Sequence, residues 1–122
     1  MKAAEATECV FEQSADKGWA FRDLIFRNQD QLRSSGSSFP ALLKTWAGQV
    51  GANQAAFNSC LDSGKYSSLI QKESATAKEL KIPGTPAIFV GNRIVQGASG
   101  GVPTTEEIGK VIDQAIAQKP GR

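Results

Sequence analysis

A single change of hydrophobic period divides this chain into two kinds of structure. As far as residue 80, apolar residues recur at the three- and four-residue spacing of amphipathic helices. Pro83, Gly84 and Pro86 then interrupt any helix, and the four apolar residues at 87–90 are typical of a short buried strand. The sequence therefore predicts a mainly helical chain that ends in a smaller, β-containing element.

The helical part is predicted to contain several helices with short connections. One helix is expected from 3 to about 15, and a second after a break at Gly18, with its apolar stripe at 21–32. The others are expected at 39–50, at 53–64 with Asn53 as the cap, and from 66 to about 80. Six aromatic residues lie on these helical stripes, and we expect them to lie in the core: Trp19, Phe21, Phe26, Phe39, Trp46 and Phe57.

The residues after Pro86 predict a β-hairpin followed by one helix. An apolar stretch at 87–90 and an expected return strand at 93–96 flank a Gly-Asn pair, which can form a tight turn. The Gly-rich loop at 97–103 lacks a phosphate-binding pattern and is interpreted as a plain connection. A Thr-x-x-Glu capping box at Thr104 opens the last helix, whose apolar face is predicted to lie across the hairpin.

The absence of histidine excludes several kinds of catalytic and metal site. Ser/His/Asp and Cys/His catalysis and Cys/His zinc sites all need an imidazole, and two thiols cannot complete a four-ligand zinc site. The net charge is only +2 and the basic residues are scattered singly, which argues against nucleic-acid binding. We therefore expect no metal, no cofactor and no nucleic-acid partner.

The sequence shows neither a membrane span nor an export signal. No stretch approaches the roughly 20 apolar residues that a spanning helix needs. The first eight residues are charged and helix-forming, where a signal peptide would have an apolar segment. These observations fit a cytosolic protein and equally a mature protein whose natural start lies elsewhere.

Two cysteines, Cys9 and Cys60, stand 51 positions apart, each on a predicted helix. They are not spaced like a redox dithiol, because no Cys-x-x-Cys pair occurs in the sequence. They could be two buried free thiols or a structural disulfide between two helices. The spacing leaves both interpretations open.

The segment at 84–92, Gly-Thr-Pro-Ala-Ile-Phe-Val-Gly-Asn, is the most informative motif. Together with Val-Gln-Gly-Ala at 95–98 and the terminal helix, it resembles the end of the DsbA-like thioredoxin-fold family. The likeness extends upstream, so that it covers essentially the whole chain, through residues 4–9, 19–29, 57–61 and 64–66.

The resemblance implies a mostly helical α/β fold. Residues 1–80 would be a helical insertion region, and residues 81–122 the β-hairpin and terminal helix of a thioredoxin-like domain, together one compact unit. Family members begin with strands and a helix that carries Cys-x-x-Cys, and we expect these to be absent here.

The resemblance also assigns roles to particular residues. It implies that Gly84, Thr85 and Pro86 form a cis-proline loop that binds a substrate or partner chain. Relatives with cysteines at the places of Cys9 and Cys60 often join them within the helical region, which favours the structural disulfide. No catalytic residue is predicted.

The expected function follows from this match and from the missing dithiol. The chain is predicted to be a partial DsbA-like thiol-disulfide oxidoreductase that is inactive as given, because it lacks a redox dithiol. The alternative is a complete, redox-inactive thioredoxin-like protein that acts in binding or assembly.

The hairpin is expected to leave one apolar strand edge open, and such an edge pairs with other chains. We therefore predict a two-fold homodimer through the Thr85 to Val90 edge, with a thiol-containing protein chain as the other candidate partner. The family resemblance favours an extracytoplasmic site, periplasmic or secreted.

Overall fold

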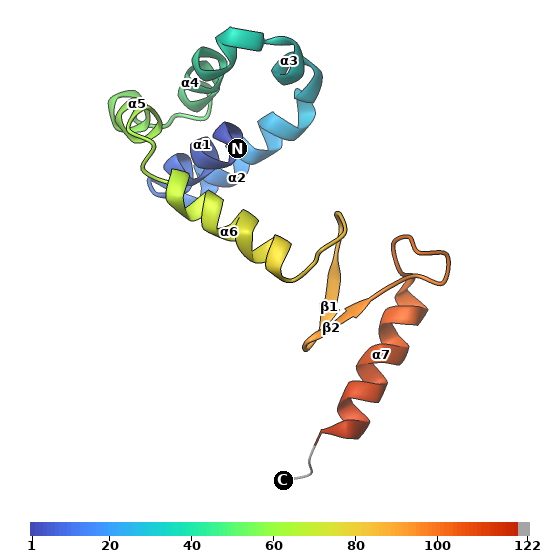
Figure 1. The fold of residues 1–122 in the computed structure, drawn as a ribbon. Helices are drawn as coiled ribbons and strands as arrows, with labels where there is room; N and C mark the ends of the chain where they lie inside the picture. Colours follow the sequence, from blue (N-terminus) through green and yellow to red (C-terminus); the bar gives the residue numbers. More distant parts are fainter. Residues whose placement is uncertain (120–122) are drawn as a thin grey trace. The chain divides into compact units, whose positions relative to one another are not determined.

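The computed structural model describes residues 1–119, and these residues fall into two compact units (Figure 1). The first unit spans Met1–Thr76, and the second begins at Ala77. Most of the described chain is helical, and one small antiparallel sheet accompanies the helices. This confirms the predicted mostly helical α/β fold class, whereas the assignment of 1–80 as an insertion and 81–122 as part of a thioredoxin-like domain stays a prediction.

The first unit is a bundle of short helices. Its helices are α1 (Lys2–Phe11), α2 (Ala15–Arg27), α3 (Gln29–Ser34), a 3-10 turn (Gly36–Ser38), α4 (Phe39–Gln49) and α5 (Gln54–Asp62). The helix α6 (Ser67–Glu79) follows and crosses the boundary between the units.

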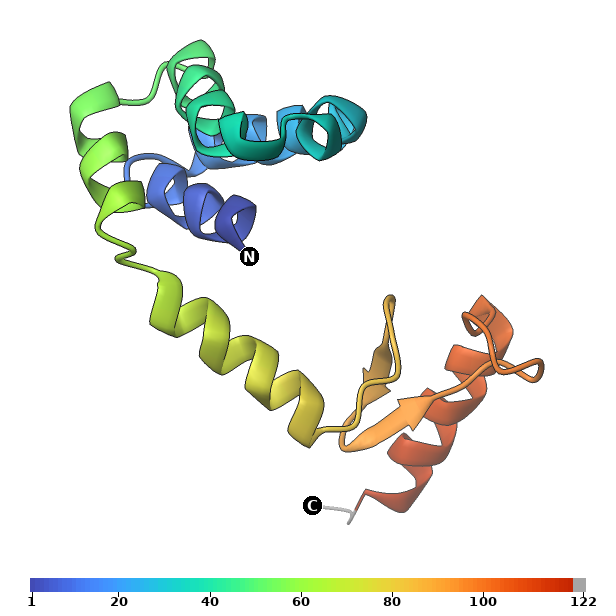
Figure 2. The same cartoon turned by 45° about the horizontal axis from the view of Figure 1, so that its top comes forward.

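The core of the first unit lies where α1 meets α2, α4 and α5 (Figure 2). Its fully buried side chains come from all four helices: Ala6, Val10, Phe21, Leu43, Ala47, Phe57 and Leu61. Trp46 is also buried, and Phe21 and Phe57 meet edge to face with ring centroids 6.0 Å apart. Burial of these apolar groups is the main stabilising contribution to this unit.

The predicted break between the first two helices is wrong in position. The first helix ends at Phe11, and α2 begins before Gly18, with Ser14 as its N-cap accepting a hydrogen bond from the Lys17 amide. Gly18 lies inside α2, and the Phe11 ring packs directly on it: a Cβ there would lie 2.4 Å from that ring. The glycine is a packing site and not a helix stop.

The expectation that all six aromatic residues lie in the core is also wrong for two of them. Trp19 is 59% exposed and Phe26 is 60% exposed, whereas Phe21 is fully buried. Trp19 and Phe26 stand two and five positions from Phe21, so at about 100° per residue they lie on the opposite side of α2. The apolar residues of α2 occupy two faces, and only one of them meets the core.

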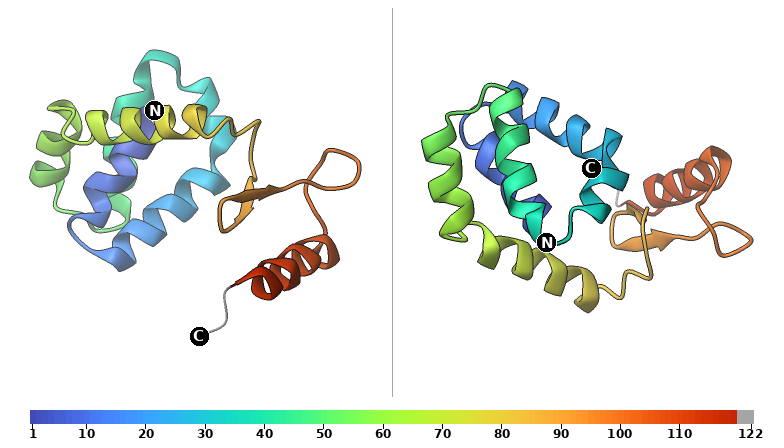
Figure 3. Two further views of the ribbon diagram at one scale, coloured as in Figure 1. Left: turned by 60° about the horizontal axis from the view of Figure 1, so that its bottom comes forward. Right: turned by 90° about the horizontal axis from the view of Figure 1, so that it is seen from above.

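The second unit contains a hairpin and one helix (Figure 3). Strands β1 (Ile88–Val90) and β2 (Arg93–Val95) pair antiparallel, and α7 (Thr105–Gln118) contacts both strands. The predicted hairpin, the capping box and the position of the last helix are therefore confirmed.

The strand at 87–90 was predicted to be buried, and this prediction is wrong. Phe89 is 37% exposed and its neighbours in β1 are only half-buried. One helix packed against a two-stranded sheet covers only one face of the sheet, so part of the hairpin stays in solvent. Within residues 1–119, no helix is long and apolar enough to cross a membrane.

Candidate functional site

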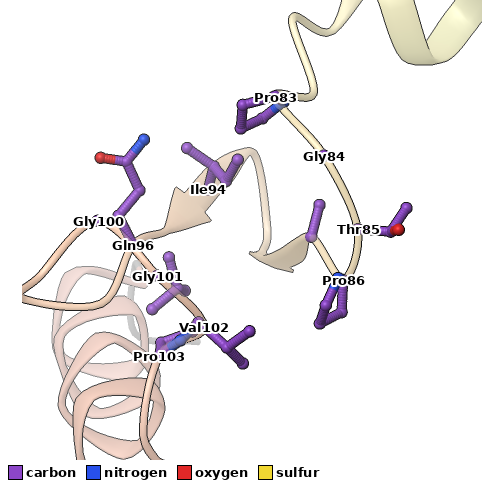
Figure 4. A pocket seen from close by; sticks show the side chains of 12 residues that line it. Pro83, Gly84, Thr85, Pro86, Ile94, Gln96, Gly100, Gly101, Val102 and Pro103 are labelled. Atoms are coloured by element: carbon purple, nitrogen blue, oxygen red, sulfur yellow. The ribbon is translucent and has the colours of Figure 1, made fainter.

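A pocket of about 240 Å³ lies beside the loop that leads into β1 (Figure 4). One side is formed by Pro83–Ala87 and the other by Gly100–Pro103, with Ile94–Gln96 of and after β2 also lining it. All of these residues belong to the second unit. The three predicted loop residues, Gly84, Thr85 and Pro86, are thus brought together at one pocket.

The loop itself is exposed. Gly84, Thr85 and Pro86 all lie in solvent, and the peptide bond between Thr85 and Pro86 is cis. A Cβ placed on Gly84 would meet no atom within 4 Å, so no neighbouring group covers the backbone there. The main-chain groups of this segment are accessible to another chain.

The far side of the pocket was not predicted from the sequence. The Gly-rich loop folds back on itself, since the Gly100 amide donates to the Gly97 carbonyl at 2.8 Å and the Gly97 amide donates to the Gly101 carbonyl at 3.2 Å. A Cβ on Gly97 would lie 3.0 Å from the carbonyl oxygens of Gly101 and Val102. A larger residue at 97 would therefore push against the backbone of Gly101 and Val102.

Glu107 fixes the same loop to the start of α7. Its two carboxylate oxygens accept hydrogen bonds from the Thr104 and Ala98 amides, each at 2.8 Å. These two backbone donors hold the pKa of Glu107 below its usual range. The sequence shows the capping box, but it carries no signal for the additional hydrogen bond that the Ala98 amide donates to Glu107.

Substituting Glu107→Gln is expected to loosen the loop at neutral pH and to matter less in acid. Because folding lowers the pKa of Glu107, its stabilising contribution is complete above its unfolded pKa of about 4.5 and is lost as pH falls through the folded value. Thermal unfolding of α7, followed through its amide signals by NMR at pH 7 and at pH 3, measures this loss of stability.

The matched control is Glu106→Gln, which removes only an exposed carboxylate paired with Lys110 at 3.0 Å. Such surface pairs contribute little to stability. A Glu107→Gln effect that is equal at both pH values, or no larger than the Glu106→Gln effect, would contradict the assigned role.

One edge of β1 has no partner strand in the described part of the chain. In the hairpin, Val90 faces Arg93 beside the two-residue turn, Phe89 faces Ile94, and Ile88 faces Val95. The pair beside such a turn is hydrogen-bonded, and hydrogen-bonded and non-hydrogen-bonded pairs alternate from there, so Phe89 and Ile94 form a non-hydrogen-bonded pair. The amide and carbonyl of Phe89 therefore face away from β2. They form the accessible main-chain groups of an open strand edge.

The two cysteines lie in the first unit, whereas the loop residues lie in the second. Cys9 on α1 and Cys60 on α5 form a disulfide, and only 1% and 8% of their surfaces are exposed. No free cysteine is present among residues 1–119.

A charged pair lies at the exposed side of this disulfide. Glu12 Oε2 is 3.9 Å from Cys60 Sγ, and the Glu12 carboxylate accepts a hydrogen bond from Lys65. That bond lowers the pKa of Glu12 and raises the pKa of Lys65. No cluster of three His, Cys, Asp or Glu side chains that could hold a metal ion occurs within residues 1–119.

Comparison with known proteins identifies a family but no individual relative. No curated protein and no solved structure matches the chain. The model of a protein family described as thioredoxin matches residues 1–114, which is nearly the whole chain. With its mostly helical α/β fold and its exposed Thr-Pro loop ahead of a hairpin, the chain belongs to the thioredoxin family.

Proposed function

We propose that these 122 residues form the substrate-contacting part of a DsbA-like thiol-disulfide oxidoreductase and do not catalyse disulfide exchange by themselves. The observation that carries this proposal is the open β1 edge that continues from the exposed Thr85–Pro86 loop. An extended substrate segment would add to that edge as a further strand, bonded to the main chain of Phe89.

The pocket supports the same interpretation. Its walls are the Pro83–Ala87 segment and the Gly100–Pro103 segment, and its volume of about 240 Å³ suits one or two side chains of an extended peptide. Main-chain bonds along an edge are independent of sequence, so they fit an enzyme class that acts on many protein substrates.

The chemistry of the family needs an accessible redox disulfide, which these residues do not offer. In dithiol oxidation a substrate thiolate attacks the enzyme disulfide, one enzyme sulfur leaves as a thiolate, and a second substrate thiolate releases the mixed disulfide. Cys9 and Cys60 are joined and almost fully buried, so a redox dithiol would come from residues outside these 122.

The compartment is part of the proposal. Structural disulfides persist in oxidising surroundings and are rare in the cytosol. The Cys9–Cys60 bond therefore supports an extracytoplasmic site, periplasmic or secreted.

Phe89→Pro is expected to weaken binding of an extended peptide, because it removes the outward amide without removing a bond to β2. The probe is fluorescein-labelled, carboxymethylated insulin B chain, whose thiols are blocked, and the readout is fluorescence anisotropy. We expect the affinity of this variant to be at least about tenfold weaker than that of the unchanged chain, because one well-placed main-chain hydrogen bond is lost.

Phe89→Ala is the matched control, since it removes the half-exposed ring and keeps the amide. It should retain most of the binding. Equal binding by Phe89→Pro and Phe89→Ala would overturn strand addition. In the same samples, insulin reduction by dithiothreitol should run at the uncatalysed rate, and turnover well above it would refute the catalytic part of the proposal.

A second candidate function is assembly by a redox-inactive member of the family. The partly exposed Phe89 and the open β1 edge favour pairing of two copies through Thr85 to Val90 about a two-fold axis. Sedimentation of the unchanged chain as a dimer, with Phe89→Pro monomeric and no peptide binding by either, would favour assembly. A monomer that binds peptide would favour the first candidate.

A further inference from the structure

The first unit carries a groove that the substrate-binding proposal does not use. It has a volume of about 380 Å³ and lies among α1, α2 and α6. Small residues of α1, Ala3, Ala4 and Thr7, line it, and Phe26 and Ile70 contribute larger apolar surface from α2 and α6. Small side chains allow another backbone to approach closely.

Exposed aromatic rings continue the apolar surface beyond the groove. Trp19 and Phe26 on α2 are 59% and 60% exposed, and Phe11 packs edge to face on Trp19 with centroids 5.3 Å apart. The Arg22 guanidinium lies 5.4 Å from the Trp19 ring and 5.7 Å from the Phe26 ring. Tryptophan, arginine and other large side chains around a pocket are typical of the residues that dominate protein interfaces.

The charges of the groove indicate what would occupy it. Glu8 lines it from α1 and Glu73 lines it from α6. In the described chain neither carboxylate forms an ion pair, while Arg22, which also lines the groove, is held over the aromatic rings. Two unpaired carboxylates on two walls of an apolar groove attract a segment that carries positive charge.

We propose that this groove, defined by Ala3, Thr7, Glu8, Phe26, Ile70 and Glu73, binds an amphipathic helix of another polypeptide. The apolar ridge of that helix lies in the groove, and lysine or arginine beside the ridge pairs with Glu8 and Glu73. An apolar channel among three helices takes a helix by its residues at i, i+4 and i+7. Because the groove lies within the first unit, this inference is independent of the Thr85–Pro86 loop.

Two designed peptides test the proposal on the full chain. Each has leucine at helical i, i+4, i+7 and i+11 positions on an alanine background, with lysine beside the leucine ridge in one and glutamate in the other. Fluorescence anisotropy is expected to show the lysine peptide bound about tenfold more tightly than the glutamate peptide, the combined effect of two favourable and two repulsive pairs.

The charge-reversed variant Glu8→Lys with Glu73→Lys should invert that preference. The matched control, Glu79→Lys with Asp113→Lys, changes the net charge equally at exposed positions outside the first unit and should leave the preference as it is. Circular dichroism confirms that both variants fold.

Equal binding of the two peptides, or a preference that shifts equally in both variants, would overturn the charge assignment. Absence of binding by both peptides would overturn the groove. Self-association of the unchanged chain that Trp19→Ala abolishes would show that a second copy covers this surface, and would also contradict the proposal.

Discussion

Replacing both Cys9 and Cys60 with alanine is expected to lower the free energy of unfolding of the first unit by about 4 kcal/mol. The disulfide closes a loop of 51 positions, and the entropy that this closure removes from the unfolded chain accounts for a stabilisation of that size. The bond joins α1 to α5 at the edge of the core, where Cys9 is almost fully buried. Alanine fills part of each site without burying a new polar group.

Tryptophan fluorescence measures this effect selectively, because Trp19 and Trp46, the two tryptophans of the sequence, both lie in the first unit. The melting temperature should fall by about 15 to 30 °C for a unit of this size. Reduction of the unchanged chain by dithiothreitol should give a similar fall. A variant that melts within about 3 °C of the unchanged chain would show that the bond does not stabilise the fold.

Replacing Phe57 with alanine is expected to cost about 3 to 5 kcal/mol, the range for a fully buried phenylalanine. Phe57 lies on α5 one turn before Cys60, has no exposed surface, and meets Phe21 of α2 edge to face. Its loss leaves a cavity where α5 packs on the other helices. The disulfide and this ring therefore hold the same helix by two independent means.

Phe26→Ala is the matched control, since it is the same substitution at a ring that is 60% exposed. Its effect on the free energy of unfolding should stay within about 0.5 kcal/mol, as for most surface changes. Chemical denaturation followed by tryptophan fluorescence compares the two variants. Comparable losses at Phe57 and Phe26 would show that the core is not centred where α1 meets α2, α4 and α5.

Local signals predicted the starts of α5 and α7 and the end of α4. Asn53 caps α5 by accepting a hydrogen bond from the Ala56 amide, and Thr104 and Glu107 form the complete capping box of α7. Gly51, with φ of +75°, follows α4 as expected from a residue that adopts left-handed backbone without strain. These features depend on neighbours three or four positions away, so one sequence is enough to find them.

Features that depend on distant contacts could not be predicted. Gly18 was predicted to separate two helices, but it lies within α2, where the Phe11 ring packs directly against it. Periodicity placed Trp19 on a helix but could not say that its side of α2 faces away from the core. Both outcomes were decided by which face of a helix meets another helix.

In the candidate site too, the local features could be predicted from the sequence and the features that depend on distant contacts could not. Gly84, Thr85 and Pro86 were found from the sequence motif, and the pocket lies beside them. The opposite wall, with Val102, depends on the backbone contact at Gly97, which no local pattern encodes.

The central claim is that an extended chain binds along the loop and strand edge from Thr85 to Val90. The most direct test is an NMR titration of the full ¹⁵N-labelled chain with carboxymethylated insulin B chain. The proposal predicts shifts concentrated in the amides of Thr85, Ala87–Val90 and Gly100–Val102. Shifts confined to α1, α2 and α6, or no shift at a peptide excess that saturates anisotropy, would contradict it.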